Sequence, residues 1–315
     1  MTVDSSAHHP ADRADPALRI GFIGLGAMGW PMAMHLHGAG HRVSVWARNP
    51  ARLHGLADAG LALLPSPAEL ARAVDVVVTN VTSTADVRQV LLGEQGVVHG
   101  AAAGLLCIDH STIAPRGARE IAAELAARGV GFVDAPVSGG AQGARDATLS
   151  IMAGGSPEDF QRALPLLRRL GRHITYLGPS GSGQVCKLCN QLVQVVTIQG
   201  LAEAMRLGAA EGADLQRLLR ALGSGFAGSR MLELMGPKMA TRDFAAGIQA
   251  RLHAKDFGLL LEAAADAGLA LPAAALVHDQ LQDLMRHGWG GDDTSSLLRV
   301  LEAAGPQDPQ DPQSP

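Results

Sequence analysis

Aromatic and basic residues are both scarce in this chain of 315 residues. Trp, Tyr and Phe together make up 3% of it, and 26 Lys and Arg are outnumbered by 30 Asp and Glu, which gives a formal net charge of −4. A surface that binds nucleic acid needs a basic patch, commonly with aromatic side chains among the charges. The composition therefore argues against nucleic acid as a partner.

Long apolar runs are missing as well. Crossing a bilayer takes about 18 consecutive apolar residues, and the Val-rich run after Leu192 is interrupted by Gln194, Thr197 and Gln199. The first 17 residues, MTVDSSAHHPADRADPA, lack the basic start and the apolar core of a signal peptide. We therefore expect no membrane partner and a cytoplasmic location.

Cysteine is rare too. The three cysteines are Cys107, Cys186 and Cys189. A small, odd number argues against a disulfide framework and agrees with a reducing compartment. Cys186 and Cys189 have the spacing of a CxxC pair, but without a second pair we expect packing rather than a metal site. None of the twelve histidines stands at HExxH-like spacing with acidic partners, so no metal is implied.

The apolar residues that are present, 47% of the chain, fall into two patterns. From Leu18, the sequence LRIGFIGLGAMG reads as a strand, a tight turn and the start of a helix. Strand-like runs follow at residues 42–46, 74–79, 104–109 and 130–133, separated by segments long enough for crossover helices. This order predicts an α/β fold, with a Rossmann-type doubly wound parallel sheet covered by helices on both faces.

Beyond Gly183 the strand pattern stops, and Ala-, Leu- and Met-rich segments follow. We expect residues 18–180 to form a dinucleotide-binding Rossmann domain, and residues 181–304 an all-helical C-terminal domain for substrate binding and oligomerisation, opened by one long interdomain helix. Residues 1–17 and 305–315 are predicted to be disordered tails, the second because GPQDPQDPQSP can bury little apolar surface. The active site is expected in the cleft between the two domains.

The first candidate site is the turn after the first predicted strand. It reads GLGAMG and consists of Gly24, Leu25, Gly26, Ala27, Met28 and Gly29. A GxGxxG pattern alone is a weak signal. Here it follows a strand and opens a helix, so backbone N–H groups and the helix N-terminus can meet a pyrophosphate. The context therefore predicts a dinucleotide site.

The residues after the second predicted strand bear on which dinucleotide is bound. NAD enzymes normally place Asp or Glu there, but this chain has Trp46, Ala47, Arg48 and Asn49. Arg48 suits a 2′-phosphate, so NADP is expected in preference to NAD. The alternative, an ordinary solvated arginine in a loop, stays open.

Four stretches stand in the order and spacing of one known family. They are GLGAMGWPMA at residues 24–33, DHSTIAP at 109–115, DAPVSGG at 134–140 and GSGQVCKLCNQ at 181–191, followed by a KD pair at 255–256. With them the chain resembles the β-hydroxyacid dehydrogenases, the 3-hydroxyisobutyrate dehydrogenase group. Within that family, GFAGSRMLELMGPKM, RDFAAGIQARLHAKD and DDTSSLL look most like the 2-hydroxy-3-oxopropionate (tartronate semialdehyde) reductases.

The resemblance implies roles for individual residues. Lys187 matches the family's catalytic lysine, which would pass a proton to or from the substrate oxygen. The residues implied in binding a small carboxylated substrate are Ser111, Ser138, Gly139, Gly140, Asn190 and Gln191. Besides the glycine loop and Arg48, those implied in binding the cofactor are Val81, Thr82, Asp86, Thr112 and Lys255. The ordinary alternatives are a turn of small residues, a polar helix surface or a solvated charge.

Two further places depart from the family's pattern. Val81 and Thr82 stand where the family usually has Leu-Pro, so the backbone of this loop is expected to differ. Ala147 stands where the family usually has glycine, which could alter a close backbone approach.

The expected activity is NAD(P)-dependent reduction of a short 3-oxo acid, 2-hydroxy-3-oxopropionate to glycerate. The alternatives are dehydrogenation of 3-hydroxyisobutyrate or a related β-hydroxyacid, an imine reductase, and a non-catalytic dinucleotide sensor; Lys187 argues against the last two. Asp109, His110 and Ser111 are the residue types of a hydrolase triad, but neighbours on an extended chain point to opposite faces. A homodimer or homotetramer is expected from the resemblance.

Overall fold

The computed structural model describes residues 2–4, 17–52, 55–56 and 58–304. The chain divides into two compact units, Met1–Lys187 and Leu188–Pro315. The division falls inside helix α7 (Ser182–Ala210), whereas the sequence predicts a boundary before that helix, at residue 180. Each unit has a hydrophobic core of its own, and each is described by itself.

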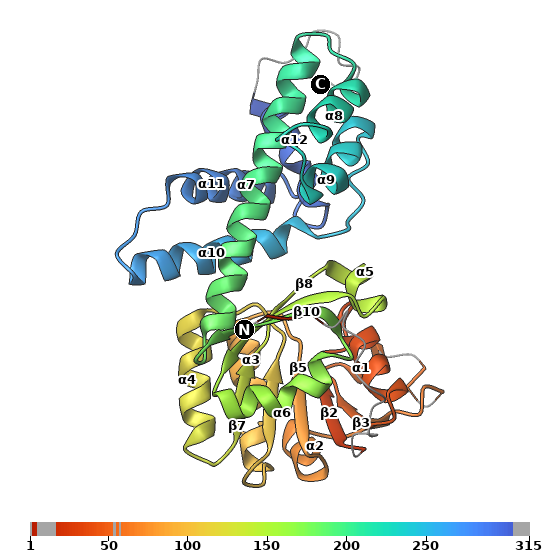
Figure 1. The fold of residues 1–315 in the computed structure, drawn as a ribbon, viewed down its shortest axis with the longest axis vertical. Helices are drawn as coiled ribbons and strands as arrows, with labels where there is room; N and C mark the ends of the chain where they lie inside the picture. Colours follow the sequence, from red (N-terminus) through yellow and green to blue (C-terminus); the bar gives the residue numbers. More distant parts are fainter. Residues whose placement is uncertain (1, 5–16, 53–54, 57, 305–315) are drawn as a thin grey trace. The chain divides into compact units, whose positions relative to one another are not determined.

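The first unit is built on one mixed sheet (Figure 1). Its strands are β1 (Thr2–Asp4), β2 (Arg19–Ile23), β3 (Arg42–Trp46), β4 (Ala62–Leu63), β5 (Val76–Thr79), β6 (Leu106–Asp109), β7 (Gly131–Asp134), β8 (Val137–Ser138), β9 (Leu149–Gly155) and β10 (Gly171–Gly178). They lie in the order β1-β10-β9-β7-β6-β5-β2-β3-β4, and β8 pairs with β9. The five strands predicted from the sequence correspond to β2, β3, β5, β6 and β7, and all neighbours among them are parallel. The predicted Rossmann-type fold is confirmed.

Helices cover both faces of this sheet (Figure 1). They are α1 (Gly29–Gly38), α2 (Pro67–Ala73), α3 (Thr84–Leu92), α4 (Pro115–Ala126), α5 (Gly140–Arg145) and α6 (Pro157–Leu167), with short 3-10 helices at Pro50–Arg52 and Val97–His99. Along β2, Ile20 and Phe22 belong to a core shared with α1 and α6, whereas Ile23 belongs to a core shared with α2, α3 and α4. Because central strands such as β5 and β6 are buried on both faces, most of their residues are apolar and do not alternate with polar ones.

Strands β9 and β10 have no counterpart in the sequence prediction. Their sequences, LSIMAGG and GRHITYLG, mix glycine and polar residues with apolar ones, so neither makes a continuous apolar run. β9 pairs antiparallel with β7, and β10 lies parallel to β9.

The edge of the sheet at β10 corrects one expectation. Thr2–Asp4 pairs antiparallel with β10 as strand β1, so these three residues are not part of a disordered tail. A sheet edge presents unpaired N–H and C=O groups, and the added strand pairs with those of β10. The remaining tail predictions, at residues 5–16 and 305–315, lie outside the described residues.

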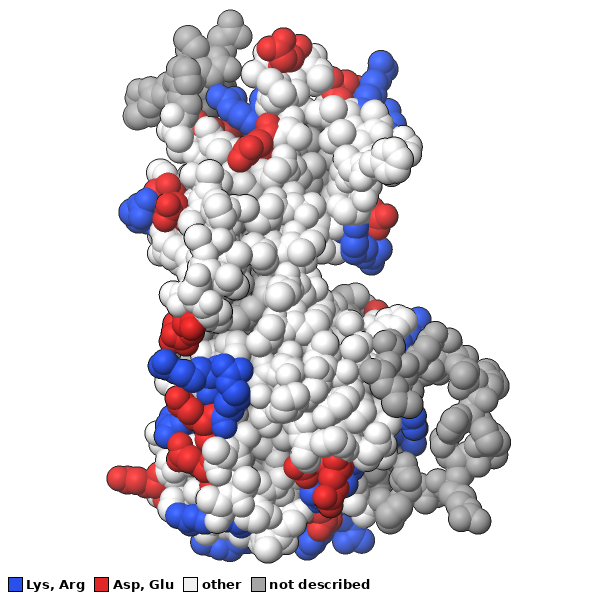
Figure 2. Space-filling model, turned by 60° about the vertical axis from the view of Figure 1, so that its left-hand side comes forward, with Lys and Arg blue, Asp and Glu red and all other residues white. Residues whose placement is uncertain are grey.

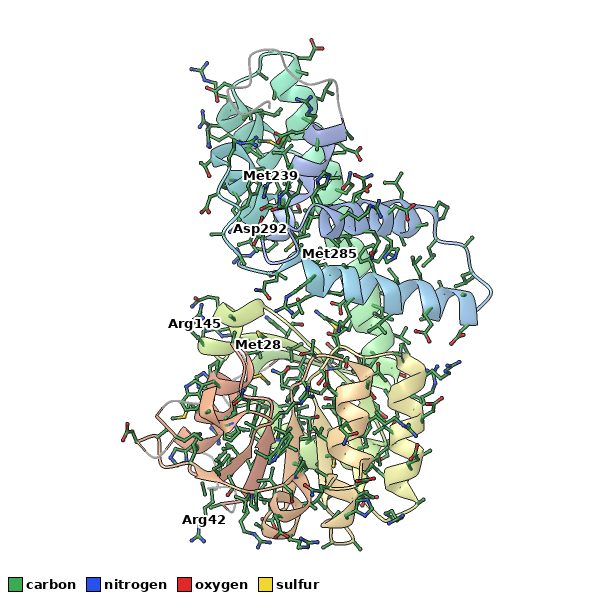
Figure 3. The ribbon with its side chains drawn as sticks, turned by 180° about the vertical axis from the view of Figure 1, so that it is seen from behind. Met28, Arg42, Arg145, Met239, Met285 and Asp292 are labelled. Carbon is green, nitrogen blue, oxygen red and sulfur yellow. The ribbon has the colours of Figure 1, made fainter. Side chains whose placement is uncertain are left out.

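In the described residues of the second unit the regular elements are helices, apart from one β-bridge between Gln249 and Asp293. Beyond α7 its helices are α8 (Leu215–Gly223), α9 (Arg230–Thr241), α10 (Ala250–Asp266), α11 (Pro272–Arg286) and α12 (Leu297–Ala304), with a 3-10 helix at Thr294–Ser296. Its core consists mainly of Leu, Ala, Val and Met side chains, and Phe257 is its fully buried aromatic residue. Met239 and Met285, labelled in Figure 3, belong to this packing. The predicted all-helical C-terminal region is confirmed.

No helix among the described residues is long and apolar enough to cross a membrane. On the face drawn in Figure 2, Lys and Arg side chains are interspersed with Asp and Glu. Basic and acidic charges are therefore mixed on that face. Among the ion pairs of the first unit are Arg19 with Asp75 and Arg88 with Glu124.

Candidate active site

The glycine loop joins β2 to α1, and two of its glycines are required by the protein's own backbone. Gly24 has a φ of +99°, and a Cβ atom there would lie 2.2 Å from the carbonyl oxygen of Asn80. A Cβ atom on Gly29 would lie 1.9 Å from the carbonyl oxygen of Gly24. Gly26 differs, because a Cβ atom there would meet nothing within 4 Å. The fold itself therefore does not need glycine at position 26.

An open position at Gly26 is what a bound pyrophosphate requires. In dinucleotide sites, the second glycine of the loop lets the backbone approach the phosphates, which lie at the N-terminus of the following helix. Here that helix is α1, and Met28, labelled in Figure 3, precedes it. Of the other loop residues, Leu25 is half-buried and Ala27 is exposed. The loop fits a dinucleotide.

A cavity of about 450 Å³ opens beside the end of β3. Its lining residues are Trp46, Ala47, Arg48, Pro50, Leu63, Leu64 and Pro65. A mainly apolar lining with the indole ring of Trp46 and one cation suits an adenine nucleotide. The guanidinium of Arg48 forms an ion pair with Asp86, so two residues predicted to bind the cofactor are brought together.

Ser111 lies in a buried hydrogen-bond network at the ends of β5 and β6. Its Oγ donates to Asp109 Oδ1 (2.6 Å), which also accepts from Thr79 Oγ1 (2.7 Å). The same Oγ accepts from the Val81 N–H (2.8 Å). The hydroxyl thus fastens the loop after β5 to the loop after β6. Thr82 and Thr112, predicted to bind the cofactor, follow Val81 and Ser111 in these two loops.

Two carboxyl groups are buried side by side at the ends of β6 and β7. Asp109 and Asp134 are register partners on these strands, and both are fully buried. Burial raises the pKa of each to about 6, although hydrogen bonds to the carboxylates act in the opposite direction. His110, also buried, has its pKa lowered to about 4 by burial, and its Nδ1 lies 2.7 Å from the carbonyl oxygen of Ala135. Because Ser111 bonds to Asp109 directly, the three residues form no hydrolase relay.

Asp134 anchors the start of α7. Its Oδ1 accepts from the Gly181 N–H (2.7 Å), and its Oδ2 accepts from the Gln184 N–H (3.0 Å). Only glycine fits at position 183, because a Cβ atom there would lie 2.4 Å from the carbonyl oxygen of Met152 and 2.9 Å from Asp134 Oδ2. These contacts fix the point on the sheet at which α7 begins.

The side chain of Gln184 connects the same turn to the loop after β6. Its Nε2 donates to the carbonyl oxygen of Ser111 (2.8 Å), and its Oε1 accepts from the Ile113 N–H (3.0 Å). Lys187 follows within one helical turn, and only 7% of it is exposed. Asp134 and Gln184 are missing from the sequence-based site, although both stand inside the family stretches DAPVSGG and GSGQVCKLCNQ.

The turn at Ser138, Gly139 and Gly140 connects β8 to α5. Gly139 has a φ of +133° and Gly140 a φ of +62°, conformations that favour glycine. Helix α5 ends at Arg145, which is labelled in Figure 3. Its carbonyl oxygen lies 2.8 Å from Nε2 of His35 on α1. The helix that follows this turn therefore packs on the helix that follows the glycine loop.

Ala147 also lies in the left-handed region, with a φ of +52°. A residue with a Cβ atom pays about 1–2 kcal/mol for this conformation. The departure from the family's glycine thus leaves strain in the turn between α5 and β9.

In the second unit, three of the predicted residues belong to one polar cluster on α7 and α10. Asn190 Nδ2 donates to Gln191 Oε1 (3.0 Å), and Gln191 Nε2 donates to Asp256 Oδ2 (2.7 Å). Lys255 Nζ lies 2.9 Å from Asp256 Oδ1. The buried carboxylate of Asp256 thus joins Lys255, predicted to bind the cofactor, to two amides predicted to bind the substrate. The KD pair in the sequence is the signal that could have included Asp256.

The DDTSSLL stretch has a structural explanation within the second unit. Asp293 is fully buried and accepts hydrogen bonds from the N–H groups of Gly247 (2.9 Å) and Ser295 (3.0 Å). Asp292, labelled in Figure 3, pairs with Arg299 (2.8 Å). These contacts tie the segment before α10 to the segment before α12.

The cysteines differ in their surroundings. Cys107 is buried in β6, where burial raises the pKa of its thiol, whereas Cys189 is exposed and Cys186 half-buried on α7. Among the described residues, no group of three His, Cys, Asp or Glu side chains is placed to hold a metal ion.

Comparison with known proteins decides the family. Residues 19–178 match the family model described as the NAD binding domain of 6-phosphogluconate dehydrogenase, and residues 181–301 match the one described as NAD-binding of NADP-dependent 3-hydroxyisobutyrate dehydrogenase. The 2-hydroxy-3-oxopropionate reductase of Escherichia coli (strain K12) is 39% identical over 289 residues, which cover 90% of this chain and 97% of the relative. The chain belongs to the β-hydroxyacid dehydrogenase family.

Other members of the β-hydroxyacid dehydrogenase family are similar to this protein. The 3-hydroxyisobutyrate dehydrogenase of Pseudomonas aeruginosa is 39% identical over 267 residues, which cover 82% of this chain and 90% of the relative. The solved structure of the Mycobacterium tuberculosis 3-hydroxyisobutyrate dehydrogenase with L-serine has a TM-score of 0.84 at 32% identity, covering 90% of this chain and 99% of that one. This β-hydroxyacid dehydrogenase is an NAD(P)-dependent oxidoreductase that acts on CH–OH groups and binds a nicotinamide dinucleotide.

The glycine loop yields a prediction that separates stability from binding. Gly26→Ala should leave the melting temperature within about 2 °C of the unaltered protein, because the added methyl group meets no protein atom. It should raise the Kd of NADP⁺ at least about tenfold, because the methyl group occupies the space needed by the pyrophosphate. Thermal unfolding and isothermal titration calorimetry measure the two effects.

Gly24→Ala is the matched control for this experiment. Its Cβ atom would collide with the backbone at Asn80, so we expect the free energy of unfolding to fall by about 2 kcal/mol or more. A Kd of NADP⁺ that is unchanged in Gly26→Ala would contradict binding of the pyrophosphate at this loop.

The buried carboxyl of Asp109 predicts a pH-dependent stability difference. Its folded pKa of about 6 lies above the ordinary value of 3.8, so the folded state binds the proton more tightly, and the group's contribution to stability falls as pH rises from about 4 to 7. Asp109→Asn lacks this titration. The free energy of unfolding of the unaltered protein, relative to that of the variant, should therefore fall by on the order of 3 kcal/mol across that interval. Urea unfolding at both pH values measures this difference, and a difference independent of pH would contradict the assignment.

Proposed function

We propose that this dehydrogenase reduces 2-hydroxy-3-oxopropionate to glycerate, prefers NADP(H) to NAD(H), and uses Lys187 as its proton donor. The observation that carries the proposal is the anchored start of α7. Lys187 follows a helical turn that is bound to Asp134 on β7 and to the loop at Ser111. Arg48 beside the cavity at the end of β3 supports the preference for NADP(H), because a guanidinium matches a phosphate in shape and charge.

The chemistry needs few groups from the protein. The bound dinucleotide supplies the hydride for the aldehyde carbon. The ammonium group of Lys187 donates a proton to the carbonyl oxygen as negative charge develops there, and accepts it again in the oxidation direction. The low exposure of Lys187 strengthens this interaction, because little water screens its charge. The hydroxyl of Ser138 and the N–H groups of the glycines after it bind the substrate carboxylate.

The amides on α7 favour the first of two candidate substrates. Asn190 and Gln191 stand about one helical turn after Lys187, and Asp256 holds the amide of Gln191 in a set orientation. These amides suit the hydroxyl group at C2 of 2-hydroxy-3-oxopropionate. The second candidate, 3-hydroxyisobutyrate, carries a methyl group there, and it is supported by the equally similar enzyme of Pseudomonas aeruginosa.

Initial rates with two aldehydes test the substrate. The aldehyde acid derived from 3-hydroxyisobutyrate differs from 2-hydroxy-3-oxopropionate in having a methyl group in place of the C2 hydroxyl. We expect kcat/KM with NADPH to be at least about 100-fold higher for the hydroxylated aldehyde, because a site that hydrogen-bonds a hydroxyl strongly rejects its analogue without one. Equal or reversed values would assign the enzyme to 3-hydroxyisobutyrate. No turnover of either, with dinucleotide binding intact, would favour a sensor.

Lys187→Ala tests the proton donor. We expect kcat to fall by at least about 1,000-fold, the upper range for loss of a general acid, while the Kd of NADP⁺ changes less than about threefold. Lys238→Ala is the matched control, because Lys238 Nζ contacts the carbonyl oxygen of Ala245 (2.7 Å) and Asp293 Oδ2 (3.5 Å), both within the second unit. Turnover within a factor of about ten of the unaltered enzyme in Lys187→Ala would remove the lysine from this role.

A further inference from the structure

The arginine proposed to read the 2′-phosphate is already bound to a carboxylate. Arg48 follows β3, and 71% of its side chain is exposed. Its guanidinium pairs with Asp86 in the first turn of α3, and the side chain of Asp86 is 24% exposed. The Oγ of Ser83 also donates to Asp86 Oδ2 (2.7 Å). Both contacts stabilise the anion, and the hydrogen bond from Arg48 is the main cause that lowers the pKa of Asp86. Asp86 therefore carries a negative charge at neutral pH.

The sheet brings this pair of charges to the nucleotide side. Strand β2, which leads into the glycine loop, lies between β3 and β5, and Ile23 is the register partner of both Trp46 and Thr79. Arg48 and Asp86 follow these two flanking strands. Opposite charges thus converge beside the glycine loop, one from each neighbouring strand. Ala47 supplies no carboxylate at the end of β3, so the acid comes from the adjacent segment instead.

We propose that Arg48 and Asp86 together read the 2′ position of the adenosine ribose, and that Asp86 limits the preference for NADP(H). Arg48 binds a 2′-phosphate. Asp86 accepts a hydrogen bond from a free 2′-hydroxyl, repels a 2′-phosphate, and competes with it for the guanidinium. The inference rests on the proposed binding of the ribose beside Arg48. The enzyme accordingly accepts both dinucleotides, and the carboxylate of Asp86 determines how strongly NADP(H) is preferred to NAD(H).

The ion pair between Arg48 and Asp86 contributes little to the stability of the fold, because most of the Arg48 side chain is exposed to solvent. Helix α3 keeps its N-terminal cap without the carboxylate, because the Ser83 Oγ accepts from the backbone N–H of residue 86 (3.1 Å). Replacing Asp86 by Asn therefore removes the charge and retains the cap, so the variant isolates the effect on the ligand.

Calorimetric titration of NADP⁺ and NAD⁺ into the purified protein tests the inference without catalysis. The measured quantity is the ratio of the two dissociation constants, Kd of NAD⁺ over Kd of NADP⁺. In Asp86→Asn this ratio should rise at least about tenfold, with NADP⁺ bound more tightly and NAD⁺ more weakly. In Arg48→Gln it should fall at least about tenfold, through weaker binding of NADP⁺. The ratio of the kcat/KM values for NADPH and NADH should move in the same directions.

Arg88→Gln is the matched control. Arg88 also lies on α3 and pairs with acidic residues of α4, so its loss removes an exposed ion pair of the same helix away from β3. The ratio should stay within about twofold of the unaltered protein in this variant. If Arg48→Gln moves the ratio and Asp86→Asn leaves it within twofold, the inference is wrong while the proposed cofactor preference stands. If the unaltered protein binds neither dinucleotide, both are wrong.

Discussion

The candidate active site depends on one buried carboxylate, that of Asp134. A carboxylate in the protein interior is costly unless its oxygens are satisfied. Here the backbone N–H groups of Gly181, just before α7, and of Gln184, in its first turn, satisfy them at the positive end of a long helix. Glycines make this close packing possible, because a Cβ atom on Gly154 or Gly183 would lie within 3 Å of Asp134. The position of Lys187 on the first unit follows from this anchor.

Asp109 has the corresponding role for the loops after β5 and β6. Its carboxylate accepts hydrogen bonds from Thr79 and Ser111, and the hydroxyl of Ser111 in turn accepts one from the N–H group of Val81. Two neighbouring strands thus end in two buried acids, one of which orders the loops while the other orders the helix. Gln184 links the two arrangements through its contacts with Ser111 and Ile113. The chemistry proposed for Lys187 therefore draws on side chains that need not touch the substrate.

The sequence predicts most of the fold, because strands buried on both faces and a glycine loop leave local patterns. It does not predict β9 and β10, whose mixed composition gives no such pattern, or the pairing of residues 2–4, which depends on a distant edge. In the site, family motifs indicate Lys187 and the loop glycines. Asp134, Gln184 and Asp256 make their contacts with residues far away in the chain, so spacing alone does not reveal them. Arg48 and Asp86 were identifiable singly, but only the sheet order reveals that they meet.

The contrast among the cysteines has a practical consequence for labelling. The thiolate is the form that reacts with alkylating reagents, and burial with a raised pKa keeps Cys107 in its unreactive thiol form. Cys189 is exposed, two residues after Lys187 on the same helix. A fluorophore or spin label attached through maleimide chemistry therefore goes to α7 first, without any cysteine being introduced. The native chain thus carries its own attachment point for a spectroscopic reporter on the helix of the proposed proton donor.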